Sequence, residues 1–409
     1  GRMPAPERRT RSDLAVAATL AMAVLVVAGT LWWVSDARNT TLMTARGPAP
    51  AAAPVREAQV PRALTEAWRA ASPATPAPVV QGSTVVTGVG GEVAGRNPDT
   101  GAIRWSYTRD LGLCTVGPGG GRVVAIYQRG DTCSEVSTLD WADGERGPQR
   151  TGPVAAPTRL TSNGSQVAVT GPHYLEVWRS DLVRALAYGR LPTPAQPNTE
   201  PRPDCGQGSV ALDTGRLAVI EHCPGEGSAR LTVQRAHPKE PDQPEVDFSV
   251  LLPGTQARVV AMNALRVAVA VSDPARLVVI DDEGRTVAQQ PLDVPDAALR
   301  GDPPGGITPV TKTPMGSYWF TGSSTLALDA DSLTPRWTRP GTLGPGSATG
   351  RQLVVPVPGA LVALDITTGK QLSSVRVDRG GYRGPVGTGF AGDLVFEQRG
   401  PVLVALRGS

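Results

Sequence analysis

The chain has 409 residues, and its 40 basic against 37 acidic residues leave a net charge of only +3. A charge so close to balance gives no electrostatic footprint for nucleic acid, whose binding domains are strongly basic. The length is sufficient for one large domain together with a membrane anchor.

The N-terminus begins with a basic tail followed by an apolar segment. Residues 1–13 contain four arginines, and residues 14–34 carry no charge. A helix of that length crosses a hydrocarbon core of about 30 Å, and the preceding arginines would keep the N-terminus cytoplasmic. We therefore predict a single-pass transmembrane helix over 14–34, with the rest of the chain extracytoplasmic. The alternative is a signal peptide cleaved near residues 35–37, although signal peptides have apolar regions of only about 7–15 residues.

Residues 35–63 are rich in alanine and proline and show little periodicity. This composition predicts an extended, partly disordered tether. Such a tether would hold the following domain outside the membrane and let it reorient.

From residue 64 onwards, a turn followed by a short β-branched strand recurs eight times. The turns are centred on Gly82, Gly121, Gly164, Gly215, Leu265, Gly316, Gly350 and Gly392. Their spacing averages about 44 residues, and this period with several short strands per repeat is typical of a β-propeller. We predict an all-β, eight-bladed propeller over residues 64–409, with seven blades as the alternative.

Within each repeat, a second apolar run ends in a polar corner, and a last strand follows. Residues 97–105 illustrate this, with Thr100-Gly101 in the corner and Trp105 in the strand. The pattern Asp-x-x-Thr-Gly-x-x-x-Trp resembles the repeat of quinoprotein-like (PQQ-type) β-propellers, with Asn97 in the aspartate position. Residues 365–373 lack the tryptophan, and residues 329–337 have Leu333 where glycine is expected. The resemblance spans roughly residues 64–409 and implies the propeller fold.

The two ends of the repeat region complement each other. The last repeat contains only two predicted strands, 394–398 and 402–407, whereas residues 65–69 form an isolated strand containing Trp68. We predict that these three strands make one composite blade. It would close the ring and remove exposed sheet edges, which promote aggregation.

The four cysteines form two similarly spaced pairs. Cys114 and Cys133 flank the opening strand of the second repeat, and Cys205 and Cys223 flank that of the fourth. The equivalent positions predict two local disulfides, each worth about 3 kcal/mol on the chain-entropy estimate, in an oxidising compartment. The alternative is four buried free thiols. Zinc is disfavoured because there is no Cys-x-x-Cys sequence, and His222 is a single suggestive neighbour.

Candidate catalytic residues are sparse. The only histidines are His173, His222 and His237, and no Gly-x-Ser-x-Gly sequence marks a hydrolase nucleophile. A Gly-x-Gly-x-x-Gly match at 387–392 precedes a β run instead of the helix that a phosphate site requires. The quinoprotein resemblance would imply PQQ, calcium and a disulfide of adjacent cysteines, but this chain has no adjacent cysteines. We therefore assign no catalytic, cofactor-binding or metal-binding residue.

The composition also bears on origin. Only three of the basic residues are lysines, and glycine and proline number 47 and 39. We interpret this as the codon bias of a GC-rich bacterium, with an actinobacterium as the favoured source.

These features favour a non-catalytic interaction scaffold in the cell envelope. It would contact an envelope or membrane protein through loops on one propeller face, contact the membrane through residues 14–34, and bind no nucleic acid. By analogy, it resembles the propeller lipoprotein of the outer-membrane β-barrel assembly machinery, although it lacks a lipobox cysteine. The alternative is a ligand-binding or redox propeller whose central funnel takes PQQ, calcium or a cell-wall sugar.

Overall fold

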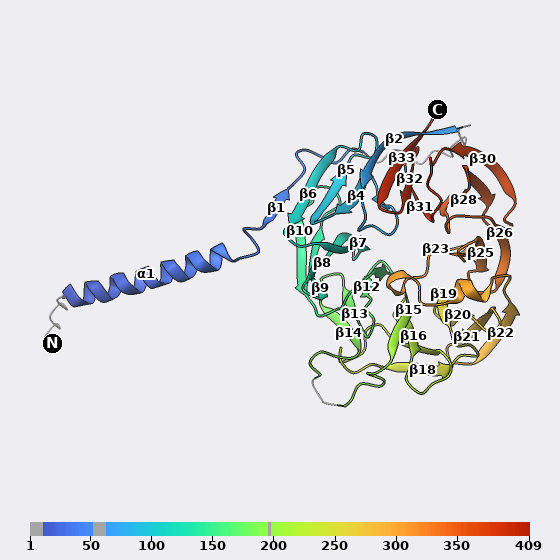
Figure 1. Ribbon diagram of the computed structural model, residues 1–409, viewed down its shortest axis with the longest axis horizontal. Coiled ribbons are helices and arrows are strands. Elements are labelled where there is room, and N and C mark those ends of the chain that lie inside the picture. The colour runs from blue at the N-terminus through green and yellow to red at the C-terminus, as the bar shows by residue number, and fades with distance from the viewer. Residues whose placement is uncertain (1–10, 52–62, 195–197) are drawn as a thin grey trace, which may run out of the picture.

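The computed structural model describes residues 11–51, 63–194 and 198–409, and β-strands dominate it. One α-helix, α1 (Arg11–Trp33), precedes all the strands of this described chain. The strands form a ring of sheets, and α1 runs outward from the edge of the ring (Figure 1). Residues 1–10 of the predicted basic tail and residues 52–62 of the predicted tether lie outside the described residues.

The strands pair antiparallel, except for a short parallel pairing of β2 with β30, and mostly in chain order. Sheet 1 has the order β1-β6-β5-β4-β3 and contains β1 (Thr40–Met43), β3 (Val79–Gln81), β4 (Thr84–Val89), β5 (Glu92–Arg96) and β6 (Ile103–Arg109). Sheet 2 contains β7 (Leu113–Gly119), β8 (Arg122–Arg129), β9 (Thr132–Leu139) and β10 (Arg146–Thr151). Sheet 3 contains β11 (Leu160–Ser162), β12 (Gln166–Val169), β13 (Tyr174–Arg179) and β14 (Arg184–Gly189).

The next three sheets repeat the four-stranded pattern. Sheet 4 contains β15 (Gly206–Asp213), β16 (Arg216–His222), β17 (Arg230–Arg235) and β18 (Val246–Leu251). Sheet 5 contains β19 (Ala257–Met262), β20 (Arg266–Val271), β21 (Arg276–Asp281) and β22 (Thr286–Pro291). Sheet 6 contains β23 (Val310–Thr313), β24 (Gly316–Phe320), β25 (Ser324–Asp329) and β26 (Pro335–Pro340).

Sheet 7 has eight strands in two halves. One half contains β27 (Ser347–Thr349), β28 (Gln352–Val357), β29 (Ala360–Asp365) and β30 (Gln371–Val377). The other half contains β31 (Val386–Ala391), β32 (Leu394–Arg399), β33 (Val402–Gly408) and β2 (Ala63–Ala71). The halves meet where the first residues of β2 pair in parallel with β30.

Burial explains two sequence patterns. The second strand of each sheet is a run of apolar residues, and the outermost strand alternates between apolar and polar residues. All five residues of β24 are buried, whereas β26 alternates between half-buried and exposed positions. A separate buried apolar cluster lies between each sheet and the next, and the last cluster joins β32 and β33 to β4 of sheet 1. A strand covered on both faces reads as a continuous apolar run, and a half-covered strand shows period-two alternation. The result is an all-β ring typical of a β-propeller.

The tryptophans of the repeat lock successive sheets together. Trp105 Nε1 donates a hydrogen bond to the carbonyl oxygen of Trp141 in sheet 2's corner, at 3.1 Å, and its ring covers Gly144. A Cβ on Gly144 would lie 2.6 Å from that ring. The same contact recurs where Trp68 covers Gly101 and where Trp337 covers Gly369, and a Cβ on either glycine would again lie 2.6 Å from the ring. The corner glycine is therefore required by the neighbouring tryptophan as well as by its positive φ.

The strand pairing closes the ring through β2, as the sequence predicts, but the closing half of sheet 7 has four strands and not three, because β31 pairs with β32. β2 pairs antiparallel with β33, from Leu64 opposite Gly408 to Ala71 opposite Val402, and β33 pairs with β32. The first described strand of the repeat region thus completes the last sheet. This removes the free edge that β33 would otherwise present.

The N-terminal region contains one strand that the sequence pattern did not predict. Thr40–Met43, inside the segment predicted as a partly disordered tether, forms β1 and adds a fifth strand to the outer edge of sheet 1. The apolar part of α1, Leu14–Trp33, is wholly exposed and long enough to cross a membrane. Its length and composition fit both a membrane anchor and a signal sequence.

Candidate functional site

Both disulfides lie on the same face of the ring, which we call the disulfide face. Cys114 pairs with Cys133 and Cys205 with Cys223, the two pairings that the repeat spacing predicts. In each pair, one cysteine lies at the entrance to the sheet's first strand and the other beside the connection between its second and third strands. The two bonds therefore fix corresponding loops on the same face, and they are consistent with an oxidising compartment.

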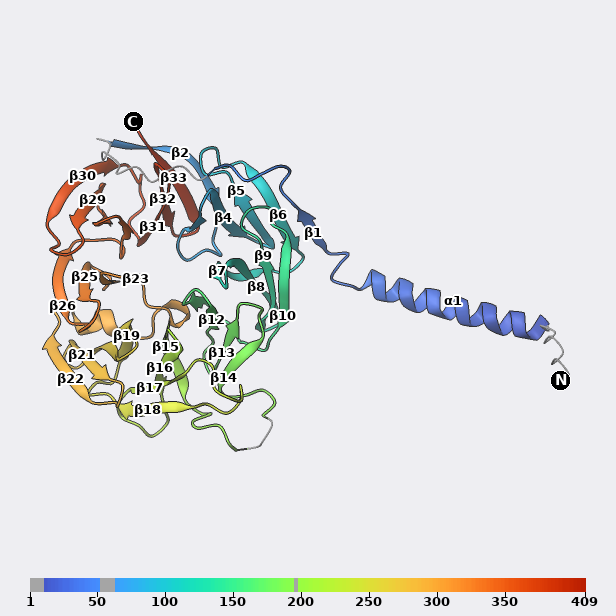
Figure 2. The ribbon, with the colours of Figure 1, turned by 180° about the vertical axis from the view of Figure 1, so that it is seen from behind.

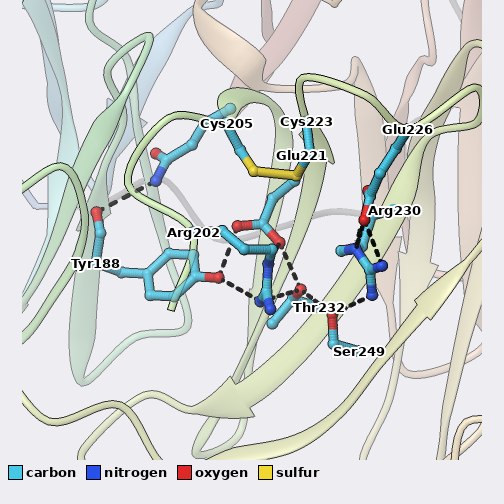
Figure 3. Close-up of polar contacts among 10 residues, drawn as sticks. Tyr188, Arg202, Cys205, Glu221, Cys223, Glu226, Arg230, Thr232 and Ser249 are labelled. Atoms are coloured by element: carbon cyan, nitrogen blue, oxygen red, sulfur yellow. Dashed lines mark hydrogen bonds and ion pairs between the residues drawn. A yellow bond between two sulfur atoms is a disulfide. The ribbon is translucent and has the colours of Figure 1, made fainter. Parts of the chain in front are cut away.

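A buried glutamate lies beneath the Cys205–Cys223 disulfide (Figure 3). Glu221 is 1% exposed, and its carboxylate accepts hydrogen bonds from Tyr188 and Thr232, both at 2.6 Å, and from Arg202 at 3.0 Å. Burial, with the Glu221 charge, raises the pKa of Tyr188 well above its usual range, so this hydroxyl remains a donor. Every oxygen of the buried carboxylate is satisfied, as a charge removed from water requires.

The network continues outward across sheet 4 (Figure 3). Ser249 lies 2.8 Å from Thr232 and accepts a hydrogen bond from Arg230, which binds Glu226 at 2.6 Å. Arg202 comes from the loop between β14 and β15, so the same network fastens that proline-rich loop to the sheet.

Two further buried glutamates near this face are paired with arginines in the same way. Glu176 in β13 binds Arg150, and Glu397 in β32 binds Arg379 from the loop ahead of β31 at 2.7 Å. Both glutamate side chains are fully buried. The sequence signal for all three is a single acid next to a run of apolar residues in a strand, and sequence reasoning missed it.

The loop between β22 and β23, residues 292–309, leaves its own sheets and lies toward the middle of the ring (Figures 1 and 2). We call it the inner loop; it contains the short turns Asp296–Leu299 and Pro304–Gly306. Asp302 binds His222 Nε2 at 3.0 Å, and the Gly305 carbonyl accepts a hydrogen bond from Thr170. The loop therefore spans the inner ends of sheets 3 and 4.

Basic side chains line the inner loop. The Asp302 carboxylate raises the pKa of His222 by hydrogen bonding, against an opposing effect of burial. Arg258 donates to the Gly301 carbonyl at 3.2 Å, and Arg159 packs against Gly305. Burial lowers the pKa of both arginines. Among the described residues, no three His, Cys, Asp or Glu side chains gather as metal ligands.

A pocket of about 640 Å³ opens on the disulfide face beside the outer strands of sheet 5. It is lined by Pro274, Ala275, Arg276, Gln289, Gln290, Pro291, Leu292, Val294 and Asp296. The volume lies within the range of binding sites for small ligands and short peptide segments. The lining combines apolar side chains with two amides, an arginine and a carboxylate.

His237 is exposed, and the other two histidines contact loops on the disulfide face. His173 Nδ1 lies 3.3 Å from the Cys205 carbonyl oxygen, and His222 is engaged by Asp302. The structure thus brings His173 and His222 to the same disulfide, where they hold loops. A catalytic triad needs a nucleophile, a base and an orienting acid in succession, and neither histidine is part of one.

Comparisons with known proteins support the fold. No protein-family model and no curated protein matches the sequence. Solved structures do match: BamB from Moraxella catarrhalis, at 13% identity and a TM-score of 0.51, covers 84% of this chain and 99% of its own. The quinohemoprotein alcohol dehydrogenase ADHIIG from Pseudomonas putida HK5 has 13% identity and a TM-score of 0.53, and the match covers 85% of this chain and 76% of that one. Sqt1 from Saccharomyces cerevisiae has 10% identity and a TM-score of 0.53, and the match covers 85% of this chain and 99% of that one.

These likenesses establish the fold alone, because every identity is far below 25%. By its name, the Pseudomonas protein is an enzyme. A shared propeller therefore does not decide between catalysis and binding, and function has to be argued from the site.

Proposed function

We propose that this chain is a membrane-anchored, extracytoplasmic propeller that acts as a non-catalytic protein-interaction scaffold in the cell envelope. Residues 1–13 would be a cytoplasmic tail, 14–34 a transmembrane helix and 64–409 the propeller, and residues 35–63 between them include β1, which joins the propeller's edge. Counting each half of sheet 7 as one blade gives eight blades. The anchor rests on the length and exposure of α1, and the oxidising location on the two disulfides.

The observation that carries the scaffold role is the pocket on the disulfide face. It lies beside β22, the outermost strand of sheet 5, and its lining amides can hydrogen-bond an extended peptide backbone. Two hydrogen bonds hold the segments that line it together, from the Leu292 amide to the Ala275 carbonyl and from the Asp273 amide to Asp296, so less ordering entropy is lost on binding. The partner is an extended segment of an envelope or membrane protein.

Site-specific photocrosslinking in intact membranes tests this function. A photoreactive amino acid at Gln290 lies in the pocket, and one at Ser165 lies in an exposed turn at the opposite end of the strands. We expect one dominant protein adduct from position 290 and none from position 165, identified by mass spectrometry. Equal labelling from both positions, or none from either, would overturn the scaffold assignment and favour a small ligand in the pocket or funnel.

A further inference from the structure

Residues 36–45, which we call the strap, bind the outer edge of the propeller. β1 pairs antiparallel with β6 over four residues, from Thr40 opposite Arg109 to Met43 opposite Ser106. Beyond the strand, the Ala45 amide donates to the Asp143 carbonyl at 2.9 Å, and Ala45 packs on the apolar cluster between sheets 1 and 2. The strap is therefore a continuation of the fold rather than a free linker.

A charge cluster fixes the start of the strap. The Asp36 carboxylate lies 3.3 Å from Arg109 and 3.0 Å from Arg129, and Glu135 approaches the same two arginines. The Arg109 side chain is only 7% exposed and lies over the Tyr127 ring, so its position is set by the propeller core. Two arginines shared between two carboxylates make a network, which is stronger than an isolated surface pair.

The strap begins almost at the end of α1. Only Val34 and Ser35 separate Trp33 from Asp36, and extended chain covers at most about 3.6 Å per residue. The intervening turn is itself hydrogen-bonded, from the Arg38 amide to the Ser35 carbonyl at 3.2 Å. The Arg38 guanidinium lies 3.7 Å from the Trp33 ring centroid. No long flexible segment therefore lies between the helix and the propeller.

This attachment determines how the ring is presented. In Figures 1 and 2 the ring is seen face-on, and α1 runs sideways from its rim and away from the ring. A helix that crosses a bilayer lies near the membrane normal. With α1 in that orientation, the plane of the ring stands upright on the membrane, and its two faces look sideways.

We propose that the strap holds the propeller upright on its rim, so that the disulfide face looks along the membrane toward a partner anchored in the same bilayer. This inference rests on the proposed membrane anchor and scaffold role. A propeller on a free tether would instead sample all orientations and reach soluble partners equally well. The strap restricts these orientations, and it thereby raises the effective concentration of the disulfide face near partners in the same membrane.

Disulfide trapping in the full-length protein tests the strap itself. Thr41 lies opposite Thr108 in the β1–β6 register, at a separation that a disulfide can bridge. We expect a third disulfide in T41C/T108C and none in T41C/R104C, where the second position lies four residues along β6. Mass spectrometry of the oxidised protein reports both. Equal bridging of the two pairs, or bridging of neither, would overturn the strap.

Fluorescence energy transfer to headgroup dyes in proteoliposomes tests the upright orientation. A fluorescent amino acid at Asp131 reports the rim near the strap, and one at Val287 in β22 reports the far side of the ring (Figure 1). We expect transfer at 131 and its loss at 287. In the variant D36A/T41P, whose folding is checked by circular dichroism, the two positions should become similar. Equal transfer in the unmodified protein would overturn the upright orientation.

The scaffold role and the strap can fail separately. If T41C/T108C bridges and transfer is lost at 287, but position 290 captures no protein, the strap stands and the scaffold role falls. If position 290 captures a soluble protein as its main adduct, the scaffold stands and the restriction to membrane partners is overturned.

Discussion

At the scale of single residues, the contacts between tryptophan and glycine explain both the repeat and its departures. Glycine recurs at positions 101, 144 and 369 because a tryptophan ring of the preceding sheet lies where its Cβ would be. Leu333 takes the corresponding place in sheet 6, with a φ of 58°. The preceding strand β22 has no tryptophan, so the leucine side chain fills the space and is buried among sheets 5 and 6.

Replacing a covered corner glycine should destabilise the protein more than replacing an open one. Gly144→Ala combines a left-handed backbone cost of about 1–2 kcal/mol with overpacking of about 1–3 kcal/mol against Trp105. The control is Gly215→Ala, because Gly215 also has positive φ but has open space around its Cβ position. Urea unfolding should show a clearly larger loss for Gly144→Ala. Equal losses would mean that the tryptophan contact does not restrict this position.

Breaking the buried ion pair on the disulfide face should also be costly. Arg202→Ala leaves the Glu221 carboxylate buried without its cation, which typically costs about 3–5 kcal/mol. The exposed pair Arg69–Glu66 provides the control, and Arg69→Ala should change stability little. Thermal unfolding of the two variants makes the comparison. A negligible effect of Arg202→Ala would show that Tyr188 and Thr232 alone satisfy the carboxylate.

At the scale of elements, the strands were predictable and their attachments were not. The opening strands follow from continuous β-branched runs, and the corners follow from aspartate, threonine and glycine. The first strand of each sheet, such as β3 and β7, escaped prediction, and so did β1 and the path of the inner loop. β1 has only four residues, and contacts outside the strand stabilise it. It pairs with the edge of β6, which lies far away in the sequence, and the Asp36 carboxylate ahead of the strand binds Arg109. The inner loop is held by a histidine and a threonine from distant sheets.

The inner loop should loosen as the pH rises. The hydrogen bond to Asp302 raises the pKa of His222 above its ordinary value of 6.5. The stabilisation is therefore complete below pH 6.5 and is lost as the pH rises through the raised pKa. The protection factors of the amides of residues 292–309, which are corrected for the base-catalysed intrinsic exchange rate, should be higher at about pH 5 than at about pH 8.

Two histidine variants control this measurement. His222→Gln should abolish the pH dependence of these protection factors, and His173→Gln should retain it, because His173 contacts the Cys205 carbonyl and not the inner loop. If exchange of the loop shows the same pH dependence in His222→Gln as in the unmodified protein, the ion pair does not control the loop.

At the scale of the whole molecule, the ring depends on a strand from each end of the repeat region. β2 covers the edge of β33, and Trp68 packs against Phe396 with ring centroids 5.9 Å apart. This closure was predictable because residues 65–69 and the incomplete last repeat complement each other. The position of the pocket on sheet 5 was not predictable, because its lining comes from two separate segments, 274–276 and 289–296, with no shared motif.

Truncations separate ring closure from attachment. A chain starting at residue 63 keeps β2 and should unfold cooperatively as a monomer, although β6 loses its β1 partner. A chain starting at residue 72 loses β2 and exposes the β33 edge, which should cause aggregation. Size-exclusion chromatography and thermal unfolding distinguish the two outcomes. A monomeric, cooperatively folded chain from residue 72 would show that β2 is dispensable.

The strap also decides where mechanical tension enters the molecule. β1 and the ring-closing strand β2 both lie ahead of the repeats, and β1 is the nearer of the two to α1 in the chain. A pull transmitted through α1 therefore reaches the Asp36 cluster and the β1–β6 hydrogen bonds before it can reach β2. Under such tension the strap detaches first. This lengthens the connection between α1 and the propeller while β2 keeps the ring closed.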